Sequence, residues 1–349
     1  NSFRIFLFVF LVFSFSTQGC KDDAVGEVEI TYDSPDGTPE SQGMDPKVLA
    51  EAYQSFQKYE GVYSLFVMRN GKIIAEQYFN GKSKNDYSNV ASVSKSFISA
   101  LTGIAVKERL IDSLEQKLPL FFPSYFTSET EASKKEIKIE NLLTMTSGLQ
   151  SIHEASGNWL SIPDIVGYSL SLEMLGFPGT RFDYNSALTH MLSVIITNKS
   201  GVTTFDYAKS KLFDKIGITC NKWEKDLFGR YIGGTGMYFT PRDLAKFGNL
   251  YVNNGKMNGE DVIPESWVSL SSQPVIKVEA SYYYGYGWWV ISSQNAKIFF
   301  AEGYGGQYIF IFKDYNMVVV ATSNPNSSEK ANIVTREFFT SKILPAIKK

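Results

Sequence analysis

The sequence predicts an α+β fold in which strands from both ends of the chain form one antiparallel sheet flanked by helices. Two observations favour this arrangement. Strand-like segments gather in the first 90 residues and again beyond residue 283, whereas the stretch from about 108 to 240 shows mostly helical patterns and loops. The chain has 349 residues, of which 44% are hydrophobic, so it can bury a large core. We therefore expect a sheet with a mostly helical insertion.

The first part of this domain combines a helix with a β-hairpin. We expect the helix near Asp45 to Tyr59 and the strands at Tyr63–Arg69 and Lys72–Phe79. Asn70-Gly71, between the strands, is a strong hairpin signal because both residues readily adopt the positive φ angles of a two-residue turn. A strand-like segment, Asn85 to Val90, then leads into the next helix.

The last part of the chain returns to the sheet after the helical insertion. The expected elements are a helix at Pro241–Asn253, strands near Tyr284–Ser292, Lys297–Ala301, Tyr308–Lys313 and Met317–Thr322, and a closing helix from about Glu329. The folded domain is thus predicted to span 45–349. Its sheet region comprises 45–107 plus 241–349, and its helical region covers about 108–240.

Residues 1–20 have the features of a bacterial lipoprotein signal peptide. An apolar stretch, Ile5 to Phe15, follows Arg4 and is short for a membrane span but suits a signal sequence. Thr17-Gln18-Gly19-Cys20 then resembles a loose lipobox, in which Cys20 is lipidated, and the alternative is an unmodified cysteine after a plain signal peptide. The acidic, turn-rich residues 21–44 predict a tether. We expect an exported protein, lipid-anchored at the periplasmic or surface side of the bacterial cell envelope.

Composition argues against several classes of function. The net charge is −2 and the Lys and Arg residues are scattered, so no basic patch for nucleic acid is expected. Two histidines and two distant cysteines provide no metal-ligand spacing, and we expect neither a metal nor a cofactor. A Gly-x-Ser-x-Gly elbow is absent. His190 fits an ordinary polar position on a helix, and His153 lies in a loop where it can line a cleft.

Ser92 and Lys95 form the motif with the most chemical content. A serine three residues before a lysine places the hydroxyl and the amine about one turn apart on the same helix face, so the lysine can accept the serine proton. We expect Ser92 in the first helical turn, where the helix dipole favours developing negative charge. The same spacing occurs at Ser55/Lys58 and Ser327/Lys330, so the motif needs support from elsewhere in the chain.

Two downstream segments supply that support. Tyr184-Asn185-Ser186 stands where a loop gives way to a helical pattern, and a buried tyrosine before a helix cap is its alternative interpretation. Gly303-Tyr304-Gly305-Gly306-Gln307 lies between two strand-like segments, where a glycine bulge or bend is the alternative.

Taken together, the three motifs occur in the order seen in the penicillin-recognising serine hydrolases. The segments Glu140–Leu149 and Gly233–Ala245 also resemble those shared by class C β-lactamases, DD-peptidases, family-VIII-type esterases and 6-aminohexanoate-dimer hydrolases. The resemblance runs from about residue 45 to the C-terminus. It implies a β-lactamase/transpeptidase-like fold with the active site between the sheet and the helical region.

The resemblance also implies a role for each motif residue. Ser92 is the expected acylated nucleophile, Lys95 its proton partner, and Tyr184 the shared general base and acid, with its phenolate favoured by the nearby ammonium. The backbone N–H groups of Ser92 and Gln307 are the expected oxyanion hole. Ser186 is expected to hold the Lys95 ammonium or the substrate amide. Further substrate contacts are expected from the third motif, at Tyr304, Gly305 and Gly306.

The third motif departs from the one usual in β-lactamases and DD-peptidases. Those enzymes carry Lys-Thr-Gly or His-Thr-Gly, whose cation and threonine hydroxyl bind a substrate carboxylate. Tyr304-Gly305-Gly306 offers neither that cation nor that aliphatic hydroxyl. The resemblance therefore favours a hydrolase that cleaves a small ester, amide or peptide through an acyl-enzyme. Alternatives are a DD-peptidase or β-lactamase, and a penicillin-type binding or sensor protein that does not turn over. Specificity is expected in the loops Gly148–Asp164 and Asp226–Tyr231.

Overall fold

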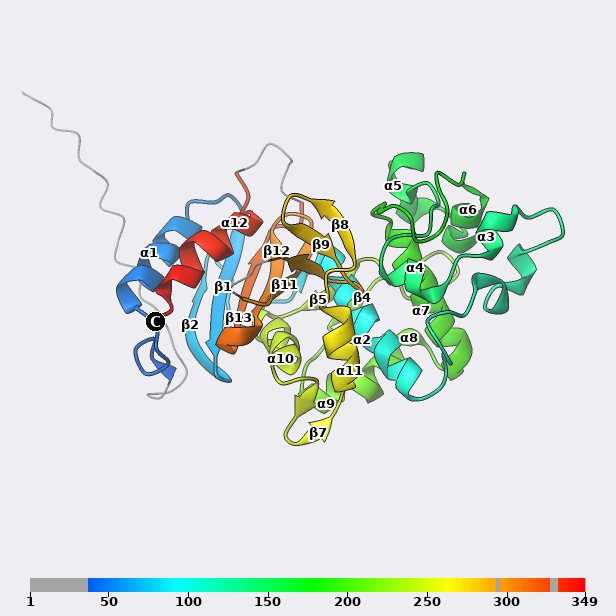
Figure 1. Cartoon of the computed structure of the whole chain (residues 1–349). Helices are drawn as coiled ribbons and strands as arrows, with labels where there is room; N and C mark the ends of the chain where they lie inside the picture. The colour runs from blue at the N-terminus through cyan, green and yellow to red at the C-terminus, as the bar shows by residue number, and fades with distance from the viewer. Residues whose placement is uncertain (1–36, 293–295, 327–331, 349) are drawn as a thin grey trace, which may run out of the picture.

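The computed structural model describes residues 37–292, 296–326 and 332–348. An antiparallel eight-stranded sheet with the order β2-β1-β13-β12-β11-β10-β9-β8 carries helices on both faces. A mostly helical region lies beside it, at the opposite end of the molecule from α1 and α12 (Figure 1). This architecture confirms the predicted α+β fold. The predicted signal peptide and Cys20 lie outside the described residues.

The N-terminal helix and hairpin form close to their predicted positions. α1, Pro46–Phe56, begins after Asp45, whose carboxylate accepts hydrogen bonds from the first backbone N–H groups of the helix. β1, Val62–Arg69, and β2, Lys72–Tyr78, are joined by Asn70-Gly71, where both φ angles are positive.

The end of the predicted tether is folded onto the domain. Met44 is buried and forms a bridge with Ile347, and Arg69 donates a hydrogen bond to the carbonyl of Gly43. Residues 37–44 therefore differ from a free linker, because an apolar side chain and a backbone acceptor at their end find partners on the domain.

β13 lies in the sheet between a strand from the N-terminal part of the chain and a strand from the C-terminal part. It spans Met317–Ser323 and pairs with β1 on one side and with β12, Gln307–Phe312, on the other. β11, Ile298–Gly303, continues the sheet. Because side chains alternate along a strand, each of these strands contributes to the core on both faces of the sheet.

The two faces of the sheet are covered by different helices. One face packs α1 and the C-terminal segment, which runs through α12, Arg336–Phe338, η8, Phe339–Ile343, and η9, Leu344–Ala346. The other face packs α2, Ser94–Lys107, and α10, Pro241–Val252. α2 also reaches the helical region, so it connects the sheet with that region (Figure 1).

The far edge of the sheet differs from the prediction. The expected strand near Tyr284–Ser292 is two strands, β9, Tyr282–Tyr284, and β10, Trp289–Ile291, and β8, Ile276–Glu279, was not expected. The bend between β9 and β10 exposes carbonyls to α2: Ser99 donates to Tyr286 O at 2.5 Å and Ser96 to Gly287 O at 2.7 Å. These bonds give the two carbonyls hydrogen-bond partners in place of those of a continuous strand. The closing helix also starts later than expected, at Arg336.

The helical region consists of short elements around one long helix. Its elements are η3, Leu118–Leu120, η4, Pro123–Tyr125, α3, Ala132–Lys135, α4, Ile139–Leu143, α5, Ile152–Ala155, η5, Trp159–Ser161, α6, Ile165–Ser171, α7, Ser186–Ser200, α8, Thr204–Ala208, η6, Lys209–Phe213, and α9, Asp214–Ile216. Further short elements are β3, Ser88–Asn89, β4, Lys222–Trp223, and β5, Met237–Phe239, which form a small sheet, then β6, Lys256–Met257, β7, Glu260–Asp261, α11, Glu265–Ser271, and η7, Lys313–Tyr315. β3 lies within the strand-like segment expected from Asn85 to Val90, but is shorter. The other two-residue strands carry too few positions for an alternating pattern, so the sequence did not reveal them.

His190 lies on a helix, as predicted, but it is a buried residue paired with a carboxylate rather than an ordinary polar position. It lies fully buried on α7, with Nε2 3.1 Å from the carboxylate of Asp226. Arg230 donates to both Asp226 and Asp164, at 2.6 and 3.2 Å, and so joins the two loops in which specificity was expected. Because buried polar groups need hydrogen-bond partners, burial of His190 requires a partner such as the Asp226 carboxylate.

Among the described residues, no helix is both long enough and apolar enough to cross a membrane.

Candidate active site

Ser92 lies at a sharp junction between β3 and α2. It occupies η2, Ala91–Val93, a 3₁₀ turn directly before α2, rather than the first α-helical turn. Ala91 has a φ angle of 47°, in the left-handed region that residues with a Cβ rarely adopt. The side chain of Asn89 supports this conformation by accepting a hydrogen bond from Ala91 N at 2.9 Å. The turn leaves Ser92 partly exposed while its two neighbours are buried.

Lys95 makes three polar contacts from a buried position. Its Nζ lies 2.9 Å from Ser92 Oγ, 2.9 Å from Ser186 Oγ and 2.7 Å from Gly234 O. The side chain is 1% exposed, and this burial lowers the pKa of Lys95 to about 7. A substantial fraction of the side chain is therefore neutral near pH 7 and able to accept a proton.

The neighbours of Lys95 fix the direction of its lone pair. Gly234 O can only accept a hydrogen bond. Ser186 Oγ lies 2.9 Å from His153 Nε2, which also faces the Ser186 backbone N–H at 3.4 Å and so acts as an acceptor. Ser186 thus gives its proton to His153 and accepts one from Lys95. The two N–H groups of a neutral Lys95 are then used, and its lone pair faces the hydroxyl of Ser92.

His153 was considered in the sequence only as a residue that can line a cleft. Partial burial, together with the smaller effect of the Lys95 charge, lowers the pKa of its ring to about 4, so the neutral acceptor form persists at pH 7. No spacing rule connects His153 with Ser186, which lies 33 residues away. Only the packing of the loop against α7 brings them together.

Tyr184 lies directly before α7, whose N-cap is Asn185. Its ring is held between aromatic neighbours, His153 at 6.2 Å and Trp289 at 6.1 Å, and Lys95 Nζ lies 4.8 Å from the ring centre. Burial raises the pKa of the Tyr184 phenol, despite an opposing interaction with the Ser92 hydroxyl. The expected phenolate is therefore disfavoured, and the geometry favours Lys95 as the base and Tyr184 as a proton donor.

The third motif forms the turn between β11 and β12, next to the Ser92 turn. A Cβ on Gly303 would lie 2.3 Å from Val90 O, so only glycine permits this approach. Gly305 and Gly306 have φ angles of 79° and 93°. Gln307 is fully buried, and its side chain donates to Ser323 O at 2.7 Å and accepts from Ser323 N at 3.1 Å. The side chain is thus fixed on β13, and the backbone is the part of Gln307 available to a substrate.

The segment Gly233–Ala245 has two structural roles. Gly233 and Gly234 pack on α7, where a Cβ on Gly234 would lie 2.7 Å from Ser186 O, and this contact brings the Gly234 carbonyl to Lys95. Further along, Thr240 and Asp243 form a capping box at the start of α10. Arg242 forms an ion pair with Glu76 on β2, and Glu76 is only 4% exposed. One part of this segment thus positions a hydrogen-bond acceptor for Lys95, and another part anchors α10 to the sheet.

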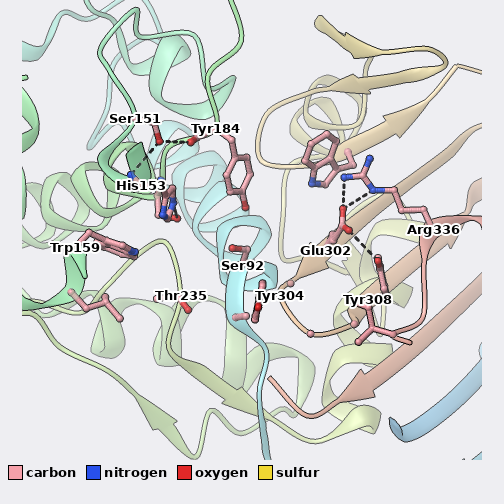
Figure 2. A pocket seen from close by; sticks show the side chains of 18 of the residues that line it. Ser92, Ser151, His153, Trp159, Tyr184, Thr235, Glu302, Tyr304, Tyr308 and Arg336 are labelled. Carbon is pink, nitrogen blue, oxygen red and sulfur yellow. Dashed lines mark hydrogen bonds and ion pairs between the residues drawn. The ribbon is translucent and has the colours of Figure 1, made fainter. Parts of the chain in front are cut away.

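A cavity of about 730 Å³ opens at Ser92. Figure 2 shows Ser92 near its centre, with His153 and Trp159 on one side and Glu302, Tyr308 and Arg336 on the other. Ser186, Thr235 and Tyr304 to Gly306 also line it, and Tyr304 is 55% exposed. Of the two loops expected to set specificity, Gly148–Asp164 contributes lining residues, whereas the lining residues include none from Asp226–Tyr231.

The described residues contain no group of His, Cys, Asp and Glu side chains arranged to hold a metal ion.

Comparisons with known proteins identify the family and the fold of the chain. The chain is 25% identical over 218 residues to a 6-aminohexanoate-dimer hydrolase of Paenarthrobacter ureafaciens, a match that covers 59% of this chain and 55% of that protein. It therefore spans about half the length of this relative. The fold is similar to that of a penicillin binding protein from Bacillus halodurans, with a TM-score of 0.67 and 17% identity over 84% of this chain and 99% of the other.

A second solved structure with the same fold is EstCE1, described as a hydrolase with promiscuous acyltransferase activity. The TM-score is 0.65 at 15% identity, over 80% of this chain and 92% of the other. The family model named Beta-lactamase matches residues 49–338, which contain all three motifs. The chain therefore belongs to the Beta-lactamase family.

Proposed function

We propose that this Beta-lactamase-family hydrolase cleaves an ester or amide through an acyl-enzyme on Ser92. The observation that carries the proposal is the contact of Ser92 Oγ with the amine of Lys95, at 2.9 Å, in a site where burial lowers the pKa of that amine to about 7. A buried amine near neutrality next to a hydroxyl on a cavity wall is the arrangement that general-base activation of a serine needs.

Acylation follows from the positions of the three side chains. Ser92 Oγ attacks the substrate carbonyl carbon while its proton passes to neutral Lys95, which becomes an ammonium. The tetrahedral intermediate collapses as the carbon–leaving-group bond breaks, and the leaving group takes the proton of the Tyr184 phenol. Lys95 then returns a proton to Tyr184. The products of this half-reaction are the acyl-enzyme and the protonated alcohol or amine.

Deacylation repeats the sequence with water in place of the leaving group. Water attacks the acyl carbon and gives a proton to neutral Lys95. The bond from the acyl carbon to Ser92 Oγ breaks as Ser92 takes the proton of the Tyr184 phenol, and Lys95 then returns a proton to Tyr184. The backbone N–H groups of Ser92 and Gln307 are proposed to bind the oxyanion in both halves, and each such donor is typically worth about 3 kcal/mol in the transition state.

The substrate proposal rests on the third motif and the cavity wall. The matched relative is named 6-aminohexanoate-dimer hydrolase, and EstCE1, whose fold is similar, is described as a hydrolase. Tyr304 supplies neither a cation nor an aliphatic hydroxyl at the position where the resemblance places the carboxylate contact. We therefore propose esters and uncharged amides as better substrates than β-lactams. A panel of p-nitrophenyl esters, nitrocefin and a D-Ala-D-Ala peptide tests this, and a single burst without turnover would instead indicate a sensor.

Replacing Tyr304 with lysine is expected to change the order of substrates. Without a cation at this position, a substrate carboxylate loses a charge-assisted hydrogen bond worth about 1.5–3 kcal/mol, which corresponds to roughly one to two decades in binding. Short-chain aryl esters should therefore have a higher kcat/KM than nitrocefin in the wild type. Tyr304→Lys should narrow the gap by raising kcat/KM for nitrocefin specifically. Tyr304→Phe serves as the control that keeps the aromatic ring. Faster hydrolysis of nitrocefin than of every ester by the wild type would show that another group binds the carboxylate.

We also propose that the protein is exported and anchored through a lipid on Cys20. The support is the lipobox-like segment before Cys20. In its native cells the protein should partition into the detergent phase with diacylglycerol on Cys20, and Cys20→Ser should release it or leave the signal uncleaved. Wild-type protein found wholly in the aqueous phase with a free Cys20 thiol would refute the anchor.

A further inference from the structure

One wall of the cavity carries a carboxylate that is held rigidly. Arg336 Nε donates to one oxygen of Glu302 at 2.7 Å, and the Tyr308 hydroxyl donates to the other at 3.0 Å (Figure 2). Tyr308 stands directly opposite Glu302 in the register of β11 and β12, which explains why the two side chains meet. Both oxygens of Glu302 are therefore fixed within the cavity wall.

The positive charge of Arg336 is already compensated inside the protein. Besides Glu302, its guanidinium contacts Glu279 at 3.2 Å, and it lies over the ring of Trp289 at 4.2 Å from the ring centre. Its side chain is 18% exposed. With two carboxylates as partners, this arginine offers little net positive charge to a substrate, although it lines the cavity.

The other charges at the cavity do not restore a positive balance. Among the described residues that line the cavity, Glu154, Asp183 and Glu302 carry carboxylates and Arg336 carries the guanidinium. Asp183 has a partner in the exposed Arg181, at 3.4 Å, and His153 acts as a neutral acceptor. Lys95 lies beneath Ser92 and is 1% exposed. The accessible wall therefore has an excess of negative charge.

Glu302 stands on the side of the cavity that faces the proton donor. Its charge raises the pKa of Tyr184, whereas the charge of Arg336 lowers it, so both groups act on the Tyr184 phenol electrostatically. Trp289 links them physically, because its ring packs on Tyr184 and beneath Arg336. In the proposed mechanism Tyr184 protonates the leaving group. A carboxylate close enough to act on Tyr184 would, in this mechanism, lie toward the leaving-group end of a bound substrate.

We propose that Glu302 is a specificity-determining residue that rejects substrates with a negatively charged leaving group and favours neutral or cationic ones. This inference rests on the proposed function, because it assigns the substrate class of the same site. Like charges held close together in a partly dehydrated cavity repel each other, and a fixed carboxylate cannot move away to relieve the repulsion.

The experiment compares three aryl acetates of similar size with the wild type and with Glu302→Gln. The substrates are 3-carboxyphenyl, 3-carbamoylphenyl and 3-(trimethylammonio)phenyl acetate, which carry an anionic, a neutral and a cationic leaving group. Glu302→Gln should raise kcat/KM for the anionic ester about tenfold relative to the neutral one, and lower it for the cationic ester. The ratio of variant to wild type removes the intrinsic reactivity of each ester.

Glu279→Gln is the matched control. It removes the other carboxylate that contacts Arg336, but Glu279 is 62% exposed on β8 and is not among the residues that line the cavity. The ratios of kcat/KM among the three esters for Glu279→Gln should stay within about twofold of those for the wild type. In the wild type, added salt should raise kcat/KM for the anionic ester and lower it for the cationic one, a test that needs no variant.

Binding separates this inference from the proposed function. Calorimetric titration of Ser92→Ala, which binds without turnover, should give the weakest affinity for the anionic ester, and the additional change Glu302→Gln should remove that difference. Equal affinities for all three esters, or the same change from Glu302→Gln as from Glu279→Gln, would overturn the role of Glu302. Charge-ordered binding without Ser92-dependent hydrolysis would leave the role of Glu302 intact and contradict the proposed function.

Discussion

Ser92→Ala is expected to lower kcat for ester hydrolysis by roughly 10⁴-fold or more while leaving the fold intact. The hydroxyl is proposed to form the covalent bond to substrate. In the part of the chain that the structure describes, Lys95 contacts the hydroxyls of Ser92 and Ser186, and Ser186 gives its proton to His153. Because the Ser92 side chain is small and partly exposed, its removal should change the circular dichroism spectrum and the unfolding midpoint little.

Ser55→Ala is the matched control for this experiment. Ser55 has the same spacing to Lys58 as Ser92 has to Lys95, but it lies on α1, where its hydroxyl donates to Glu51 O and Lys58 is exposed. A fluorophosphonate should label the wild type and Ser55→Ala equally and should not label Ser92→Ala. Persistent labelling of Ser92→Ala would assign the nucleophile to another serine.

Lys95→Ala is expected to slow acylation by about 10³-fold, because it removes the base that takes the Ser92 proton. In the wild type, kcat/KM should fall as the pH drops below about 7, since the amine must be neutral and its pKa is lowered to about 7 by burial. The activity should level off at higher pH. Lys58→Ala, which replaces an exposed lysine, should retain the wild-type dependence of kcat/KM on pH. A wild-type profile that stays flat between pH 5 and pH 8 would exclude Lys95 as the base.

Tyr184→Phe should also slow acylation severely, and its combination with Lys95→Ala tests whether the two residues act together. Groups that act as one unit lose little more when a second member is removed. The double variant should therefore be about as slow as the slower single variant. Fully additive losses would indicate that Lys95 and Tyr184 serve separate sites.

The sequence predicted those parts of the fold that depend on local patterns. The Asn70-Gly71 hairpin follows from turn chemistry and α10 from a helical pattern, and both lie close to their predicted bounds. The division of the C-terminal aromatic segment into β9 and β10 could not be predicted, because the bend at Tyr286-Gly287 is stabilised by Ser96 and Ser99 on α2, almost two hundred residues earlier. A long-range partner of this kind leaves no periodic signal.

The candidate site shows the same contrast. Ser92, Lys95, Tyr184 and Ser186 could be found because motif spacing and order carry information about them, and the structure brings them together. The contacts of His153, Glu302 and Arg336 could not be found, because they depend on loop packing, strand register and the docking of the C-terminal segment. The expected Tyr184 phenolate was not supported, since the sequence showed a nearby amine but not the burial that raises the phenol pKa.

Rapid acid quenching followed by peptide mass spectrometry tests the central claim most directly. The wild type is mixed with a p-nitrophenyl ester, stopped within milliseconds, digested and analysed for an added acyl mass. The account predicts one acylated peptide, with the acyl group on Ser92, that appears during the burst and decays as the ester is consumed. Acylation of a different residue, or rapid turnover with no acylated peptide at any time, would contradict the acyl-enzyme on Ser92.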